Sequence, residues 1–308
     1  MAESTQHRKF QRLVQKFEPQ SKLIRVWGLK GGVSAQTTKI EIRQPDGQSK
    51  KLVVRRHGPG DLERNSNITT DEFRLLRITG ESGLPTPTPY YLDTSCEIFP
   101  TPYLVLDYVD GDTEFAPPSL DDFLLESATQ LSRIHRADIS NADLSFLPSL
   151  QDRCAEKIGT RPAKLDESIG EGRIREALES VWPWTPWNEA ALMHGDFWPG
   201  NILWKDGRVV AVIDWEDAEL GDPLADLAIS RLEILTAFGI DAMKIFTERY
   251  ESMMSLDFTN LPIWDLYAAL RPAFRFADWA EDDVAERAMR EGHRLFVAQA
   301  FETLSARH

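Results

Sequence analysis

The stretch LMHGDFWPGNILW at residues 192–204 decides the fold of this chain, and it continues as KDGRVVAVIDWE at residues 205–216. Two short apolar runs joined by a turn that contains glycine predict a β-hairpin. Asn201 and Asp214 lie at the two outer ends of this hairpin, and Asp196 precedes Asn201 by five residues. The pattern therefore predicts that Asn201 and Asp214 approach each other in space.

Three polar side chains in this stretch match the needs of phosphoryl transfer. That reaction has a loose transition state, and its catalysis consists mainly of positioning and charge neutralisation. One carboxylate must orient the attacking hydroxyl and take up its proton, a role that fits Asp196. Oxygen ligands must hold Mg²⁺ against the nucleotide phosphates, a role that fits Asn201 and Asp214. The alternative is structural, with Asp196 and Asn201 serving only as hydrogen-bonding residues of a turn.

The same region resembles a known enzyme family. The resemblance is carried by HGD at 194–196, Asn201, IDWE at 213–216 and GDPLADL at 221–227, and it extends over residues 23–235. These motifs are similar to those of the aminoglycoside phosphotransferase and choline kinase-like family, whose members are related to protein kinases. The resemblance implies a two-lobed α+β fold of the protein-kinase type. Its N-terminal lobe is a small antiparallel β-sheet with a helix, and its larger C-terminal lobe is mainly helical.

The resemblance also implies roles for individual residues. Asp196 is expected to be the catalytic base, and Asn201 and Asp214 the Mg²⁺ ligands, which are the roles that the side-chain chemistry indicates. His194, counted with Asp196 among the catalytic residues, is expected to brace the loop rather than to react. Two roles remain open for Glu216, which either reaches Mg²⁺ through a water molecule or caps the following helix.

Local patterns along the chain agree with this organisation. Apolar residues spaced by three and four predict a helix over residues 6–17. Thr69 and Glu72 form a capping-box pattern at the start of a later helix. Strands are expected at 23–29, 36–42, 51–56, 90–93 and 103–108, and further helices near 69–80, at 121–135 and 171–181, and from Pro223 onward. We expect a nucleotide-binding lobe over 1–108 and a catalytic and acceptor-binding lobe over 109–308.

The N-terminal lobe offers two groups of phosphate contacts. Gly31, Gly32 and Ser34 lie between the first two strands, where glycines allow close backbone approach to phosphates and N–H groups donate to them. The alternative is a purely structural hairpin tip. By resemblance, Arg55 contacts the α and β phosphates and pairs with Glu72, whereas the alternative is a solvated surface pair.

The nucleotide base has a weaker signal. The strand at 103–108 resembles the hinge that binds an adenine edge through its backbone, which points to Leu106 and Tyr108. Backbone contacts leave no side-chain signature. ATP is therefore the expected nucleotide, and GTP remains an alternative.

The composition narrows the class of protein. The 308 residues include 42% hydrophobic and 27% charged residues, which is typical of a globular protein. A formal net charge of -14 disfavours nucleic acid and anionic membranes and would attract a cationic acceptor. The run DWAEDD at 278–283 places acidic groups beside an aromatic ring, either for a cationic amine or as an exposed helix start.

Cysteine usage and hydropathy point to a cytoplasmic protein. Cys96 and Cys154 show no metal-ligand spacing and no sign of a disulfide framework. The N-terminus is polar and lacks the apolar core of a signal peptide. No apolar run approaches the ~18 residues that a membrane crossing needs. The expected partner is a small molecule with a hydroxyl group.

Two functions remain in competition. The first is a Mg²⁺-dependent kinase that moves the nucleotide γ-phosphoryl group to a hydroxyl of an aminoglycoside, amino sugar, amino alcohol or similar compound. The second is a nucleotide-binding pseudokinase with a regulatory role, suggested by arginine at position 55 and the irregular glycine loop. A protein kinase is disfavoured because the segment Gly221-Asp222-Pro223 enters a helix soon after Asp214, in place of an activation loop.

Overall fold

The computed structural model of the protein describes residues 5–29, 35–183 and 187–306. Its contacts divide the chain into two compact units. The first unit contains Met1–Gly111 and Val210–Glu216, and the second contains Asp112–Val209 and Asp217–His308. The sequence had indicated a single division after residue 108, with residues 210–216 in the C-terminal lobe.

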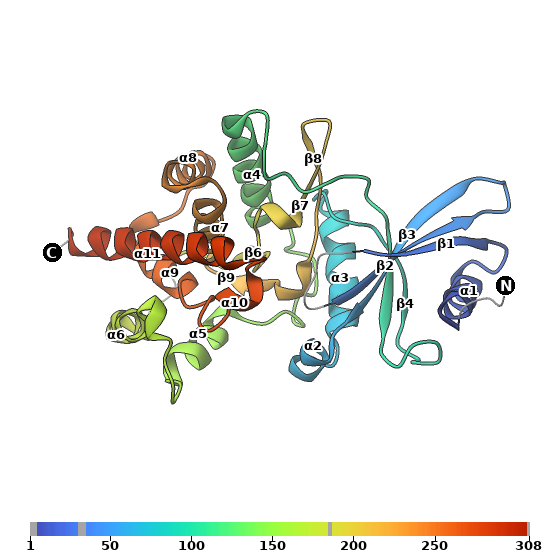
Figure 1. The fold of residues 1–308 in the computed structure, drawn as a ribbon, viewed down its shortest axis with the longest axis horizontal. Coiled ribbons are helices and arrows are strands. Elements are labelled where there is room, and N and C mark those ends of the chain that lie inside the picture. The colour runs from blue at the N-terminus through green and yellow to red at the C-terminus, as the bar shows by residue number, and fades with distance from the viewer. Residues whose placement is uncertain (1–4, 30–34, 184–186, 307–308) are drawn as a thin grey trace. The chain divides into compact units, whose positions relative to one another are not determined.

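The first unit is built on a five-stranded antiparallel sheet (Figure 1). Its strands are β1 (Lys22–Gly28), β2 (Ala35–Arg43), β3 (Ser49–His57), β4 (Pro89–Asp93) and β5 (Tyr103–Asp107). Their spatial order is β1-β2-β3-β5-β4, and each neighbouring pair is antiparallel. β3 therefore lies at the centre of the sheet, where its backbone is paired on both sides.

Helices α1 (Thr5–Phe17) and α3 (Ile68–Glu81) pack against the sheet, and the short helix α2 (Pro59–Arg64), which has no buried residues, precedes α3. Leu52 and Val54 of β3 share a hydrophobic core with apolar residues of α1. Side chains alternate between the faces of a strand, so Arg55 and His57 point to the opposite face, where both contact Glu72 of α3. The sheet thus separates an apolar core from a polar, charged face.

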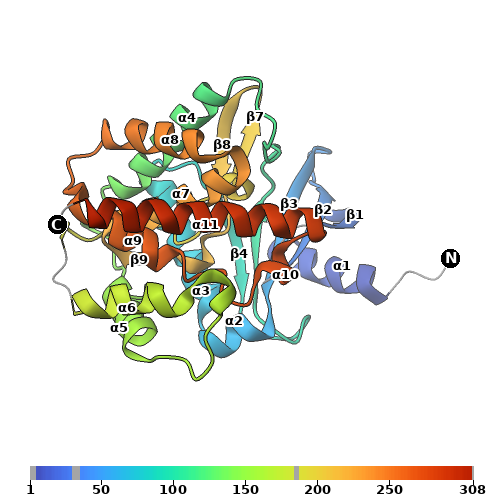
Figure 2. The same cartoon turned by 60° about the vertical axis from the view of Figure 1, so that its left-hand side comes forward.

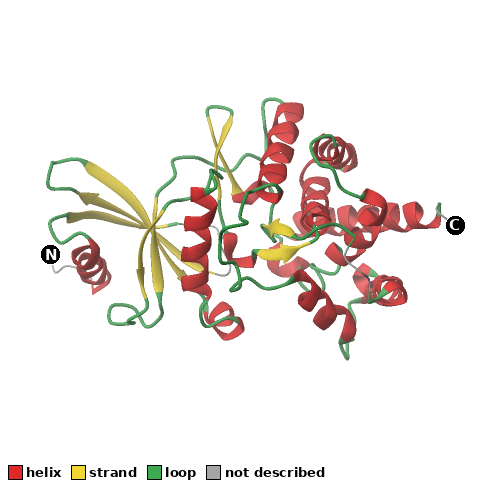
Figure 3. Ribbon diagram, turned by 180° about the vertical axis from the view of Figure 1, so that it is seen from behind, coloured by secondary structure: helices red, strands yellow, loops and turns green. Residues whose placement is uncertain are grey.

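The second unit is mainly helical. Its helices are α4 (Leu120–His135), α5 (Leu150–Gly159), α6 (Glu171–Val181), α7 (Pro223–Phe238), α8 (Ile240–Glu251), α9 (Leu261–Ala268), α10 (Phe276–Trp279) and α11 (Asp283–Ser305). Figure 2 shows α11 running past α9 and α7, against which it packs. A short antiparallel pair, β6 (Ala191–Met193) and β9 (Glu219–Gly221), lies among these helices (Figure 3).

The predicted hairpin and the predicted α+β class are confirmed. β7 (Ile202–Lys205) and β8 (Arg208–Val212) form a two-stranded sheet, and β8 leads the chain from the second unit into the first. Among the described residues, no helix has both the length and the apolar character that crossing a membrane would require.

Some local predictions need correction. α2, α5 and β9 were not predicted. The six-residue helix α2 and the three-residue strand β9 are too short to show a period. The capping box was also wrong, because α3 begins at Ile68 after the N-cap Asn67. Thr69 Oγ1 instead lies 3.0 Å from His57 Nδ1, and Glu72 binds Arg55. Tertiary contacts have taken over both side chains that the local pattern assigned to the helix end.

Candidate active site

A tight turn after β6 presents the predicted catalytic aspartate. Gly195 has φ +78°, in the left-handed region, and a Cβ atom there would lie 2.1 Å from the carbonyl oxygen of Asp217. Glycine avoids both the backbone strain and this clash. The chain can therefore turn sharply between His194 and Asp196 because position 195 carries no side chain.

A buried carboxylate on α7 anchors this turn. Asp226 accepts hydrogen bonds from the backbone N–H groups of His194, at 2.7 Å, and Gly195, at 3.0 Å. It also lies 3.1 Å from Nε2 of His135, whose Nδ1 is 2.6 Å from the Tyr250 hydroxyl. Burial alone would raise the pKa of Asp226, but the hydrogen bond and charge of His135 and the interactions with His194 lower it below its usual value. The buried His135 ring thus links α7 to α8 in a structural position.

The carboxylate of Asp196 is held from two sides. Asn201 Nδ2 donates to Asp196 Oδ2 at 3.0 Å and to the Asp196 carbonyl oxygen at 2.9 Å. Arg271, which follows α9, donates from Nη2 to Asp196 Oδ1 at 2.5 Å and from Nη1 to the Gly195 carbonyl oxygen at 2.9 Å. The Asp196 side chain still keeps 26% of its surface exposed. It is therefore oriented by its neighbours and remains reachable from solvent.

His194 lies behind the loop. Its side chain is fully buried, and its Nδ1 accepts a hydrogen bond from the backbone N–H of Asp196 at 3.3 Å. Its ring packs edge-on against Phe197, with 6.0 Å between the ring centres. This position suits a brace for the loop, and its burial does not suit a group that meets a substrate.

Arg55 is the centre of an ion network in the first unit. Its Nε lies 3.1 Å from Glu72, and its Nη2 lies 2.5 Å from both Asp214 and Glu216. The side chains of Arg55 and Glu72 are only 11% and 3% exposed, so the alternative of a solvated surface pair is excluded. Burial alone would lower the pKa of Arg55, but the charges of the three carboxylates raise it above its usual value.

The charge of this network suits a metal-bound phosphate. Glu72, Asp214 and Glu216 bring three carboxylates around the single guanidinium of Arg55. Asp214 has φ +69°, which is uncommon for a residue other than glycine, and its side chain is 24% exposed. Mg²⁺ in nucleotide sites is commonly held by one or two carboxylates together with phosphates and waters. The hard oxygen donors and the excess negative charge fit that ion.

Within the part of the chain that the structure describes, no group of three or more His, Cys, Asp and Glu side chains is arranged to hold a metal ion. A metal at Asp214 would therefore depend on the nucleotide for its remaining ligands. Asn201 belongs to the second unit and Asp214 to the first, and their approach to each other stays a prediction.

The remaining nucleotide residues are placed as follows. Leu106 is buried in β5, where it pairs with Val53 of β3 and Pro89 of β4. The Tyr108 N–H donates to the carbonyl oxygen of Lys51 at 3.2 Å, so this donor is already engaged. Their role as adenine contacts stays a prediction. The predicted phosphate contacts Gly31, Gly32 and Ser34 lie outside the described residues.

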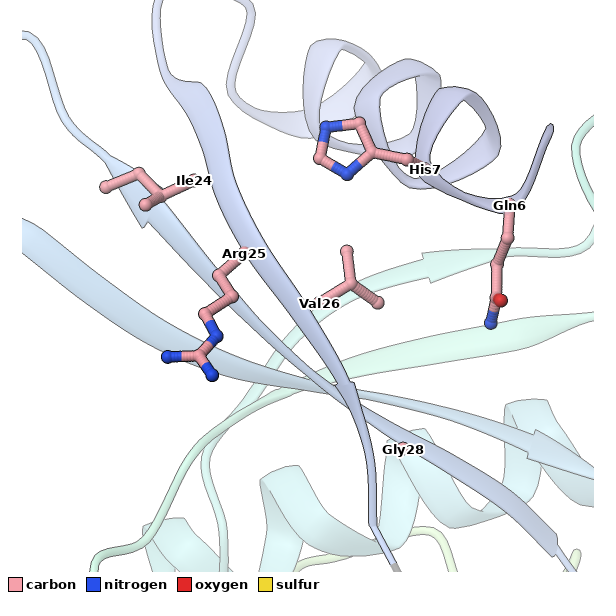
Figure 4. A pocket seen from close by; sticks show the side chains of 6 residues that line it. All are labelled: Gln6, His7, Ile24, Arg25, Val26 and Gly28. Atoms are coloured by element: carbon pink, nitrogen blue, oxygen red, sulfur yellow. The ribbon is translucent and has the colours of Figure 1, made fainter. Parts of the chain in front are cut away.

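A hollow of about 340 Å³ lies elsewhere in the first unit (Figure 4). It is lined by Gln6 and His7 of α1 and by Ile24, Arg25, Val26 and Gly28 of β1. It contains none of the predicted site residues, and its lining is mostly polar. The structure therefore gives it no part in the site.

The acidic run at 278–283 has a structural task. Asp282 is the N-cap of α11, and its Oδ1 accepts hydrogen bonds from the N–H groups of Val284, at 2.9 Å, and Ala285, at 2.8 Å. Asp283 lies in the first turn of the same helix, where the helix dipole favours a negative charge. This arrangement supports the helix-start interpretation of the run over a contact with a cationic acceptor.

Comparison with known proteins identifies the family. The model of the phosphotransferase enzyme family, APH, matches residues 27–270. The chain belongs to this family. The match includes Arg55, the loop from His194 to Asn201, and Asp226, and it ends one residue before Arg271.

Individual relatives differ in length and name. Viomycin phosphotransferase of Streptomyces vinaceus is 28% identical over 159 residues, covering 47% of this chain and 55% of that protein. Acyl-CoA dehydrogenase family member 10 of Mus musculus is 27% identical over 248 residues, covering 71% of this chain. The chain spans only 23% of the length of that relative, which is therefore much larger.

The fold has solved counterparts. A thermostable mutant of aminoglycoside phosphotransferase APH(4)-Ia, in a ternary complex with AMP-PNP and hygromycin B, matches with a TM-score of 0.62. The match covers 97% of each chain at 18% sequence identity. At this identity the likeness establishes the shared fold.

Two residues of the site had no assigned role at the sequence level. Asp226 lies inside the GDPLADL motif, so its acidic side chain was visible but its bonds to residues 194 and 195 were not. Arg271 lies 75 residues from Asp196 in a segment without a motif. Only the folded arrangement brings its guanidinium to the carboxylate of Asp196.

Proposed function

We propose that this family member transfers the γ-phosphoryl group of a Mg²⁺-bound nucleotide to a hydroxyl group of a small molecule. The observation that carries the proposal is the Asp196 carboxylate, which Asn201 and Arg271 orient while it remains reachable. The first unit would bind the nucleotide, with ATP expected and GTP as the alternative. The second unit would bind the acceptor, and the reaction would take place in the cytoplasm, the location that the cysteine usage and hydropathy predict.

The side chains divide the chemistry between them. Asp196 would align the acceptor hydroxyl and accept its proton as the new oxygen–phosphorus bond forms. Asn201 donates through Nδ2 to Asp196, which leaves its amide oxygen on the far side of the carboxamide, where Mg²⁺ would bind. Asp214 would be a second ligand, and Glu216 would assist it. Mg²⁺ would neutralise charge on the transferred phosphoryl group.

Arg55 would act on the nucleotide phosphates. Its guanidinium is held against Glu72 of α3, as a phosphate-binding cation in this family is expected to be. The arginine fork can donate to two phosphate oxygens at once, which a lysine ammonium does less specifically. The nucleotide analogue in the solved counterpart supports a nucleotide site on this fold, and the names of the relatives support a small polar acceptor.

One observation favours a second candidate, a nucleotide-binding pseudokinase with a regulatory role. Arg55 lies 2.5 Å from Asp214 and would compete with Mg²⁺ for the same carboxylate. If that pair persisted in the nucleotide complex, the protein would bind nucleotide and transfer nothing.

Nucleotide binding and transfer can be measured separately. Calorimetry with ATP and GTP, with and without Mg²⁺, is expected to show Mg²⁺-dependent binding by the wild type and loss of that dependence in Asp214→Ala. Across an acceptor panel, ADP or GDP release is expected to fall about 10²- to 10⁴-fold in Asp196→Asn, with nucleotide binding retained. Asp206→Asn, in the exposed β7–β8 turn, is the matched control.

Each outcome separates the candidates. Undiminished transfer by Asp196→Asn would remove that residue from the mechanism. Tight nucleotide binding without transfer to any acceptor would favour the pseudokinase. Folded wild-type protein that binds neither nucleotide would contradict both candidates.

A further inference from the structure

A lysine in the second unit lacks a counter-ion. Lys157, on α5, is half-buried, and its ammonium lies 4.8 Å from the centre of the Tyr267 ring. Within the described part of the chain, no carboxylate forms an ion pair with this ammonium. Removing a cation from water without pairing it is unfavourable. The lone aromatic contact therefore does not explain why a charge is placed here.

The charges around Lys157 are mostly of the same sign. Burial and repulsion from the guanidinium groups of Arg271 and Arg175 lower the pKa of Lys157 to about 8, and Arg153 adds to the effect. Each arginine has a carboxylate partner of its own. These pairs are Arg271 with Asp196 at 2.5 Å, Arg175 with Glu171 at 2.7 Å, and Arg153 with Glu219 at 3.0 Å. Within the described residues, Lys157 therefore differs from these three arginines in having no carboxylate partner.

A second polar group beside Lys157 is also unsatisfied. Tyr267 is 7% exposed, and its hydroxyl makes no conventional hydrogen bond within the described residues. Its polar neighbour is the thiol of Cys154, which is a weak hydrogen-bonding group. Buried hydroxyl groups normally have a partner. The Lys157 ammonium, which has no ion pair, thus lies against the ring of Tyr267, whose hydroxyl lacks a conventional hydrogen-bond partner.

These donors are linked to the catalytic loop. Arg271 acts electrostatically on Lys157 and donates hydrogen bonds to Asp196 and to the carbonyl oxygen of Gly195. The Arg175 guanidinium donates to the backbone carbonyl of Lys157 at 2.7 Å, which fixes the end of α5. The backbone at Lys157 is therefore held in a defined place, and Arg271 acts both on Lys157 and on the proposed base.

We propose that Lys157, the Tyr267 hydroxyl and Arg271 bind an anionic group, a carboxylate or a phosphate, of the acceptor whose hydroxyl is presented to Asp196. The proposal rests on the proposed phosphotransferase function and narrows its acceptor to hydroxy compounds that carry a negative charge. An anion supplies the counter-ion that Lys157 lacks and the acceptor atom that Tyr267 lacks. The negative net charge of the protein does not oppose this, because charges beyond about 10 Å are largely screened by salt.

The first arm of the test measures anion binding without catalysis. Thermal unfolding is followed in sodium phosphate, in sodium acetate and in sodium chloride of equal ionic strength. Phosphate or acetate is expected to raise the Tm of the wild type over chloride, and Lys157→Met is expected to lose this rise. The exposed lysine variant Lys244→Met is the matched control and should keep it. Comparison of phosphate with acetate shows which anion the site prefers.

The same arm distinguishes an anion site from a structural lysine. Because Lys157 has no counter-ion to lose, Lys157→Met in chloride is expected to melt at the wild-type temperature or above it. A large fall in its Tm, or an equal anion effect in wild type and Lys157→Met, would overturn the proposal.

The second arm measures transfer to matched acceptors, namely short hydroxy acids, their primary amides and amino alcohols. The wild type should prefer the acid to its amide. Lys157→Met should raise KM for the acid about tenfold to a hundredfold, as expected for loss of a charge-assisted hydrogen bond, and leave the amide unchanged, whereas Lys157→Arg should retain activity on the acid. Equal effects on acid and amide, or preference for the amino alcohol, would contradict the proposal. If no compound is phosphorylated, the transfer function fails while the melting arm still decides the anion site.

Discussion

Asp226, which anchors the loop that carries Asp196, offers the sharpest test of the structure. In Asp226→Asn the side chain keeps its size and one oxygen, but it loses its charge and gains an NH₂ group. The wild-type carboxylate faces donors from His194, Gly195 and His135, and it is completely buried. In the variant the NH₂ group must face at least one of these donors. At least one buried N–H group is therefore left without an acceptor.

The magnitude follows from these contacts. A hydrogen bond to a charged group contributes about 1.5–3 kcal/mol, and an unsatisfied buried donor costs about 1–3 kcal/mol. Two backbone N–H groups lose the charged acceptor, and one of them loses its acceptor altogether. We therefore expect Asp226→Asn to lower the free energy of unfolding by about 3–5 kcal/mol at pH 7, in the range found when one partner of a buried charged network is removed.

Urea unfolding followed by tryptophan fluorescence measures this change. The exposed aspartate variant Asp241→Asn, whose wild-type side chain is 90% exposed on α8, is the matched control and should change stability by less than about 0.5 kcal/mol. Transfer activity, measured without urea at a temperature well below the Tm, should also fall, because the residue 226 side chain no longer holds the loop that carries Asp196. A loss of stability below about 1 kcal/mol in Asp226→Asn would refute the assigned role.

The pH dependence provides an internal check. The pKa of Asp226 is lowered in the folded protein, so its contribution is present above the unfolded pKa of about 3.9 and is lost as the pH falls through the lower folded value. The stability difference between wild type and Asp226→Asn should thus be constant from pH 5 to 7 and shrink below pH 4. A difference that instead grew toward low pH would contradict the sign of the shift.

Two further predictions concern the same loop and its surroundings. Gly195→Ala should abolish detectable transfer and lower the Tm, because position 195 has a positive φ and the added Cβ would clash with the Asp217 carbonyl. Gly60→Ala is the control and should be neutral or stabilising, because nothing lies within 4 Å of a Cβ there. Normal activity in Gly195→Ala would be incompatible with this turn. Burial, opposed by Arg271 and supported by Asp196, raises the pKa of Glu233 to about 7. Ionisation of Glu233 therefore destabilises the folded protein increasingly as the pH rises from about 4.3 to 7. Glu233→Gln should stabilise the protein by on the order of 1–3 kcal/mol at pH 8 and by little near pH 4.5. Equal changes in the free energy of unfolding at the two pH values, measured in urea, would count against this assignment.

Much of the architecture was visible in local sequence. Apolar spacing placed α1, α6 and the strands of the sheet close to their observed positions. The reason is that hydrophobic periodicity and turn residues depend only on side chains a few positions apart in the sequence. The HGD-to-Asn201 loop likewise carries its chemistry in one short stretch. α5 was not predicted, although its buried residues Leu150, Cys154 and Ile158 recur every four residues, as on one face of a helix.

By itself, the sequence determined the α+β class, the family and the loop that carries Asp196 and Asn201. Tertiary structure alone decided which charges meet: Arg271 at Asp196, 75 residues away, Arg55 at Asp214, 159 residues away, and no carboxylate of the described chain at Lys157. The physical reason is that helix and strand patterns arise from neighbours along the chain. Ion pairs, burial and unsatisfied donors depend instead on atoms brought together by folding, and they leave no periodic trace in the sequence.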